Sequence, residues 1–161
     1  PKIVETLRKQ YETWLADVGR DHGYEAPRIL IGTPHEPTTV LTRQDWRGRS
    51  AARSPRGLGH WELAVPKGGV FRVTVDLDRP TKAAVVKLRL QATESDIALA
   101  PGDNPHGKAP APYSLPADGV RVVFPKISLK ASPAERLKTW AEEEGVDRPR
   151  GVRFVYVERV E

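Results

Sequence analysis

The chain has 161 residues, a length that suits one globular domain with a sizeable core. Hydrophobic residues make up 39% and charged residues 29%, which is ordinary for a globular protein, and no apolar run is long enough to span a bilayer. We therefore expect no membrane partner. The formal net charge of +5 is compatible with an anionic partner, although charge alone argues only about solubility and non-specific attraction.

Two residue types are missing from the sequence. The chain has no methionine and opens at Pro1, so we expect it to be a fragment, the C-terminal piece of a longer protein. It also has no cysteine, which excludes disulfides, thiol nucleophiles and zinc sites with cysteine ligands. The absence of cysteine does not distinguish an exported domain from a cytosolic one.

The first segment has the periodicity of an amphipathic helix. Its apolar residues recur at spacings of three and four, which places them on one stripe. We expect this helix to span 1–19 and to end at Gly19. Because a single helix needs a surface to cover such a stripe, we expect it to contact another domain or a second copy of the chain. The candidate interface residues are Leu7, Tyr11, Trp14 and Val18.

After Gly23 the sequence changes to short runs of strand-forming residues, separated by glycine and proline. The segment 101–119 is rich in both and is expected to be a loop. The predicted strands lie at 28–32, 38–42, 59–65, 70–77, 83–90, 97–99, 120–124, 127–129 and 151–160.

The segment that begins at Ser132 has conflicting signals. Ser132 to Glu135 resembles a capped helix start, with proline in the first turn. The residues that follow also alternate, with Leu137 and Thr139 on one face of a strand and Trp140 on the other. Because its neighbours are predicted strands, we expect a strand that runs through about residue 143.

These elements predict a mainly β protein, or α+β by strict count. The expected fold is an antiparallel β-sandwich of about eight short strands, preceded by one amphipathic helix. The expected organisation is a linking helix at 1–19 and a sandwich domain at 24–161.

The sequence contains no recognisable catalytic constellation. No nucleophile motif or phosphate-binding loop is present, and the four histidines have no spacing that would direct two rings at one metal ion. Turn aspartates could join a calcium site, but we favour their ordinary role in turns. These aspartates are Asp76, Asp78, Asp103 and Asp118. We expect no catalytic residue, no metal and no cofactor in this chain.

An arginine-rich stretch at 41–61 is the strongest candidate for ligand binding. It contains two tryptophans, Trp46 and Trp61, and the arginines Arg43, Arg47, Arg49, Arg53 and Arg56. Arginines and aromatic rings together could bind nucleic acid, although an arginine-rich loop without a known fold is weak evidence. The same stretch could bind a sugar, or its tryptophans could simply pack in the core. The candidate ligand-binding residues are Asp45, Trp46, Arg47, His60 and Trp61.

The order of several blocks resembles the C-terminal region of bacterial arylsulfatases. The blocks that carry this resemblance are Tyr11–Val18, Pro27–Gly32, Leu41–Trp46, Gly59–Val65, Gly69–Val75 and Gly151–Val157. The resemblance implies a non-catalytic accessory domain of a sulfate ester hydrolase, which would pack against the catalytic sulfatase domain of the same chain. It also implies a periplasmic or secreted location.

The resemblance places the chemistry outside this chain. A parent sulfatase would use calcium and a formylglycine made within a Cys/Ser-x-Pro-x-Arg motif, and Ser54-Pro-Arg56 does not match that spacing. The alternatives are a stand-alone carbohydrate-binding β-sandwich and, with less support, a nucleic-acid binder that uses the basic loop.

Overall fold

The computed structural model describes residues 2–23, 26–49, 51, 57–107, 115 and 117–161. Its elements are α1 (Lys2–His22), β1 (Ile29–Leu30), β2 (Thr38–Thr42), the 3-10 helix η1 (Arg43–Asp45), β3 (Trp61–Val65), β4 (Gly69–Asp78), β5 (Ala84–Leu90), β6 (Thr93–Leu99), β7 (Gly119–Leu129), β8 (Ser132–Glu143), β9 (Arg150–Gly151) and β10 (Phe154–Arg159).

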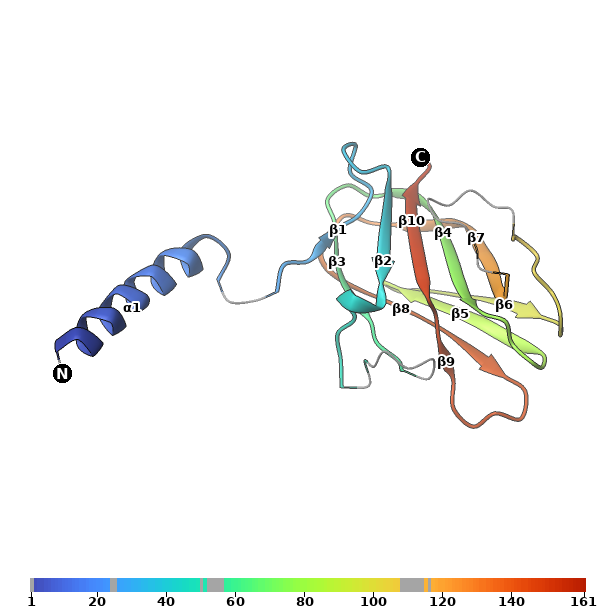
Figure 1. Ribbon diagram of the computed structural model, residues 1–161. Helices are drawn as coiled ribbons and strands as arrows, with labels where there is room; N and C mark the ends of the chain where they lie inside the picture. Colours follow the sequence, from blue (N-terminus) through green and yellow to red (C-terminus); the bar gives the residue numbers. More distant parts are fainter. Residues whose placement is uncertain (1, 24–25, 50, 52–56, 108–114, 116) are drawn as a thin grey trace.

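The strands form two sheets that face each other (Figure 1). One sheet has the order β1-β3-β8-β5-β6, with β9 also paired to β8, and the other has the order β2-β10-β4-β7. All pairings are antiparallel except that of β1 with β3. The predicted fold class is confirmed: the chain is mainly β and forms a sandwich with one helix.

The described residues form ten strands against the expected number of about eight, and two segments are divided differently from the prediction. The two strands expected within 120–129 form the single strand β7, in which the register shifts opposite Phe71 and Val73. This irregularity accommodates Pro125, which has no N–H to donate to the ladder. Conversely, the expected strand at 151–160 is split into β9 and β10, which pair with different sheets.

The strand expected from Ser132 is confirmed as β8. It pairs with β3 on one side and β5 on the other, so Leu137 lies opposite both Trp61 and Leu90. Leu137, Thr139 and Ala141 are buried in the core. Pairing on both edges outweighs the local helix-start signal, because tertiary contacts routinely override propensity.

The open edge of β7 is covered by side chains from the preceding loop. The backbone N–H of Arg121 donates to Oδ1 of Asn104 at 2.9 Å, and that of Val123 donates to Nδ1 of His106 at 3.2 Å. Two side chains thus replace a neighbouring strand at this edge, a common way to prevent strand addition by another chain.

The helix α1 ends later than predicted. It continues through Gly19 to His22 and ends at Gly23, whose positive φ of 66° and N–H bond to the Gly19 carbonyl form the C-terminal cap. A helix can pass through a glycine, whereas the left-handed residue is what ends it. Within the described residues, no helix is both long and apolar enough to cross a membrane.

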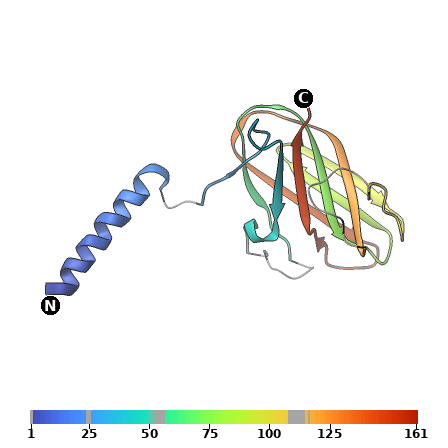
Figure 2. The ribbon, with the colours of Figure 1, turned by 45° about the horizontal axis from the view of Figure 1, so that its top comes forward.

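The predicted apolar stripe of α1 is exposed. Leu7, Tyr11, Trp14 and Val18 are 55–58% accessible, and Figures 1 and 2 show α1 extending away from the sandwich. The interface role of these residues stays a prediction.

Candidate ligand-binding site

A surface cavity of about 360 Å³ lies beside the start of β3 and the middle of β8. Its walls come from the segments around 47–49 and 58–60, from β8, and from the turn before β9. The lining residues are Arg47, Gly48, Arg49, Leu58, Gly59, His60, Lys138, Thr139, Trp140 and Pro149.

The alternation of β8 places Trp140 in this cavity. Leu137 and Ala141 face the core, so the even-numbered residues Lys138 and Trp140 lie on the outer face of the sheet. The Trp140 indole N–H donates to Glu142 Oε1 at 2.8 Å. Glu142 also pairs with Lys87 at 3.1 Å, so the ring is held by a polar pair.

The charge of Glu142 is stabilised by both partners. Hydrogen bonds from Trp140 and from Lys87 hold the pKa of the Glu142 carboxyl below its ordinary value. Glu142 therefore remains a carboxylate at neutral pH and remains an acceptor for the indole.

A short backbone pairing brings the segment around Arg47 to the cavity. The N–H of Arg47 donates to the His60 carbonyl at 2.8 Å, and the N–H of His60 donates to the Arg47 carbonyl at 3.1 Å. Two residues paired in this way direct their side chains to the same side. Gly48, at φ 106°, then turns the chain, and a Cβ there would lie 3.3 Å from the His60 ring.

The titratable residues that line this cavity are all basic. They are Arg47, Arg49, His60 and Lys138. Within the part of the chain that the structure describes, no hydrogen bond or ion pair engages the side chains of Arg47, Arg49 or Lys138. These three cations are exposed and available to a ligand.

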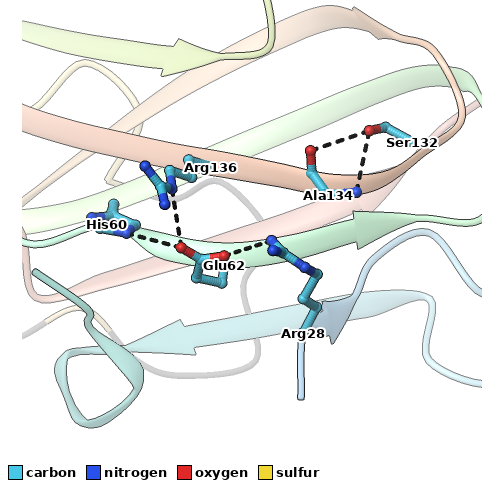
Figure 3. A network of polar contacts seen from close by, with 6 residues as sticks. All are labelled: Arg28, His60, Glu62, Ser132, Ala134 and Arg136. Carbon is cyan, nitrogen blue, oxygen red and sulfur yellow. Dashed lines mark hydrogen bonds and ion pairs between the residues drawn. The ribbon is translucent and has the colours of Figure 1, made fainter. Parts of the chain in front are cut away.

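A carboxylate on β3 organises the basic residues next to the cavity (Figure 3). Glu62 accepts from Arg28 at 2.5 Å and from Arg136 at 3.0 Å, and lies 3.2 Å from the His60 ring. Burial alone would raise the pKa of Glu62, but hydrogen bonds from Arg136 and His60 and the nearby arginine charges together hold that pKa below its ordinary value.

Two of the five predicted ligand-binding residues line the cavity. Arg47 and His60 do so, whereas Asp45 is exposed elsewhere and accepts a hydrogen bond from the Thr42 hydroxyl at 3.0 Å. Thr42 also caps η1 by accepting from the Gln44 N–H.

The other two predicted residues are corrected by their burial. Trp46 is 6% and Trp61 0% accessible, so neither presents a ring face to a ligand. Their rings contact each other at a centroid distance of 5.6 Å, and the Trp61 indole donates to the Thr42 carbonyl at 2.7 Å. Both serve the core, which the sequence allowed as an alternative.

Two glycines make room for Trp46. A Cβ on Gly59 would lie 2.6 Å from the Trp46 ring, and so would a Cβ on Gly151. The guanidinium carbon of Arg43 lies over the Trp46 ring, 5.3 Å from the ring centroid. The Nε–H of Arg43 donates to the Val152 carbonyl at 2.7 Å. Within 41–61, Arg53 and Arg56 lie outside the described residues.

The turn aspartates already have protein partners. Asp76 accepts two hydrogen bonds from Arg121, Asp78 and Asp118 both pair with Arg153, and Asp103 accepts from the Ala100 N–H. Within the described ranges, no three His, Asp or Glu side chains group as metal ligands.

Comparisons with known proteins support the fold alone. No protein-family profile and no curated protein matches the chain. Among solved structures, the Cry4Aa toxin from Bacillus thuringiensis is similar over 85% of this chain with a TM-score of 0.55 and 11% identity. The chain spans about a quarter of that toxin's length, 25%.

Two carbohydrate-binding modules are also similar to parts of the chain. A family 35 module from Clostridium thermocellum covers 74% of this chain and 96% of its own, with a TM-score of 0.45 and 8% identity. The C-terminal CBM6 of a marine laminarinase from Zobellia galactanivorans covers 76% and 99%, with the same TM-score and identity.

These findings correct the sulfatase identification. The similar structures reported include carbohydrate-binding modules and not sulfatase domains, and no sequence match supports a sulfatase or another hydrolase. The prediction of an arylsulfatase accessory domain was wrong by these comparisons. It relied on short blocks, and the Leu41–Trp46 and Gly59–Val65 blocks are explained by packing around Trp46 and Trp61.

Proposed function

We propose that the chain is a carbohydrate-binding β-sandwich module that holds a sugar in the cavity beside Trp140. The observation that carries this proposal is the half-buried Trp140 ring among exposed side chains that can donate hydrogen bonds. An indole offers a flat apolar surface to the C–H groups of a sugar ring, while the surrounding donors can bind its hydroxyls. A cavity of about 360 Å³ is within the size range of small-ligand sites.

The walls of the cavity are built on defined structure. Trp140 is on the central strand β8, and the backbone pairing of Arg47 with His60 fixes the opposite wall. Such positioning lowers the entropy lost on binding. Fold similarity adds nothing to this proposal, since one fold serves many functions.

The test is affinity gel electrophoresis against a panel of neutral and acidic polysaccharides. We expect at least one polysaccharide to retard the native protein, and Trp140→Ala to remove that retardation. Trp14→Ala is the matched control, because Trp14 is an exposed tryptophan on α1. Retardation that survives Trp140→Ala, or no retardation by any polysaccharide, would reject the proposal.

A further inference from the structure

We propose that the ligand is an acidic saccharide, with carboxylate or sulfate groups on successive sugar units that lie along the outer face of β8. This inference rests on the proposed function and specifies its substrate class. It begins from a second cavity, of about 430 Å³, which shares Lys138 with the first. The two cavities therefore adjoin at Lys138. In this proposal they form one binding track, the outer face of β8 from Ala134 to Trp140.

The track follows the alternation of β8. Ala134 and Arg136 line the second cavity, Lys138 lines both, and Trp140 lines the first. At about 3.3 Å per residue, the distance from Ala134 to Trp140 is roughly 20 Å. This length accommodates several linked sugar units, so more than one charged group can contact the track.

The charge of the track is positive even after its ion pairs are considered. Arg28, Arg89 and Arg136 line the second cavity with one carboxylate, Glu135. Glu62 pairs with two of these arginines and Glu94 with Arg89. Arg47, Arg49 and Lys138 add three cations that have no partner among the described residues, and the Lys87–Glu142 pair lies beside Trp140. In total, seven permanent positive charges lie near four carboxylates.

Such an arrangement favours an acidic sugar over a neutral one. Guanidinium groups match carboxylate and sulfate oxygens with paired hydrogen bonds, whereas neutral hydroxyls need acceptors as well as donors. The first cavity has no carboxylate among its described lining residues.

The same arrangement argues against single-stranded nucleic acid. Stacking of successive bases needs a series of aromatic rings, and Trp140 is the one Trp, Tyr or Phe residue that lines either cavity within the described residues. A single indole ring among several cations suits an acidic sugar chain, in which one sugar unit stacks on Trp140 and the acidic groups pair with the cations.

The experiment compares matched probes with the native protein. Dextran and dextran sulfate share a neutral backbone, polygalacturonate carries carboxylates, and a single-stranded oligonucleotide tests nucleic acid. We expect dextran sulfate or polygalacturonate to bind at least about tenfold more tightly than dextran, and the difference to shrink with added salt. A preference for dextran sulfate would indicate recognition of sulfate groups, and a preference for polygalacturonate would indicate recognition of carboxylate groups.

Charge-reversed variants test the position of the site. Lys138→Glu should weaken binding of the acidic probe about tenfold or more. Lys126→Glu makes the same change in net charge at an exposed site on β7 and should leave affinity unchanged. Equal losses in the two variants would show non-specific attraction and overturn the inference.

The remaining outcomes separate the two proposals. If dextran binds through Trp140 as tightly as the acidic probes, the carbohydrate proposal stands and the acidic substrate class is rejected. If the oligonucleotide binds most tightly and Trp140→Ala does not alter acidic sugar binding, both are rejected. If none of these probes binds, the acidic substrate class is rejected, and the carbohydrate proposal is then decided by the wider polysaccharide panel.

Discussion

The indole N–H of Trp140 donates to Glu142 at 2.8 Å, and this bond sets the orientation of the ring in the cavity. We predict that Glu142→Ala weakens sugar binding about three- to tenfold, because the ring loses its acceptor and becomes free to reorient. Glu142→Gln keeps an acceptor oxygen and should retain most of the affinity. Calorimetric titration of both variants checks this, and equal affinities in Glu142→Ala and native protein would contradict the positioning role.

The packing of Trp46 against Gly59 should be sensitive to one methyl group. Gly59→Ala places a carbon 2.6 Å from the Trp46 ring and should lower the free energy of unfolding by about 1–3 kcal/mol. Denaturant unfolding measures this change. In a Trp46→Leu background the same substitution should cost less, because the smaller side chain relieves the overlap. An equal cost in both backgrounds would point to backbone strain rather than to the contact.

A buried ion pair stabilises the second sheet. Arg121 donates to both oxygens of Asp76 at 2.6 Å, and the Tyr156 hydroxyl donates to Asp76 at 3.1 Å. Asp76→Ala should lower the free energy of unfolding by about 3–5 kcal/mol, because it leaves a buried guanidinium without its carboxylate.

The double variant Asp76→Leu with Arg121→Met is the control for this pair. It removes both charges together and should recover most of the lost free energy, since apolar replacements of buried pairs are often neutral. Both variants are compared by denaturant unfolding at neutral pH. The Tyr156 hydroxyl loses its Asp76 acceptor in both variants, so this loss is common to the two. A double variant no more stable than Asp76→Ala would show that the unpaired charge of Arg121 does not account for the lost free energy.

Glu62 gives the stability a defined dependence on pH. Its pKa is held below the ordinary value of 4.5, so it stabilises the fold above that pH, and the contribution is lost as the pH falls through the lowered pKa. Glu62→Gln should therefore be less stable than native protein at pH 7, with the difference shrinking below about pH 4.5.

Melting curves from pH 3 to pH 7 measure the difference between the native protein and Glu62→Gln. Glu5→Gln is the control, because Glu5 is exposed on α1 and has no ion pair among the described residues. A Glu62→Gln deficit that stays constant across this range would contradict the role of charge at Glu62.

The sequence predicts the strands better than the site. Alternation identifies β2 with its correct bounds and β8 against a competing helix signal, because burial of alternate residues is a local pattern. The same alternation predicts that Trp140 lies on the other face of the strand from Leu137 and Thr139, and this is the sequence signal available for the site. Which tryptophan lies at a cavity depends on segments distant in the sequence, since the wall opposite Trp140 comes from Arg47 and His60.

The sequence leaves two interpretations of the tryptophans near the arginines, ligand binding and core packing. Both rings fill the core between the sheets, so the burial of Trp46 and Trp61 supports the second interpretation. The glycines that accommodate Trp46 are Gly59 and Gly151, about ninety residues apart, and no local pattern connects them.

Titration of ¹⁵N-labelled protein with an acidic oligosaccharide is the most direct test of the central claim. The indole N–H signal of Trp140 and the amide signals of Arg47 and Lys138 should shift together in a saturable way, while the indole signal of Trp14 stays in place. Saturable shifts confined to α1, or no shift at Trp140 at saturating sugar, would contradict a binding site on the outer face of β8.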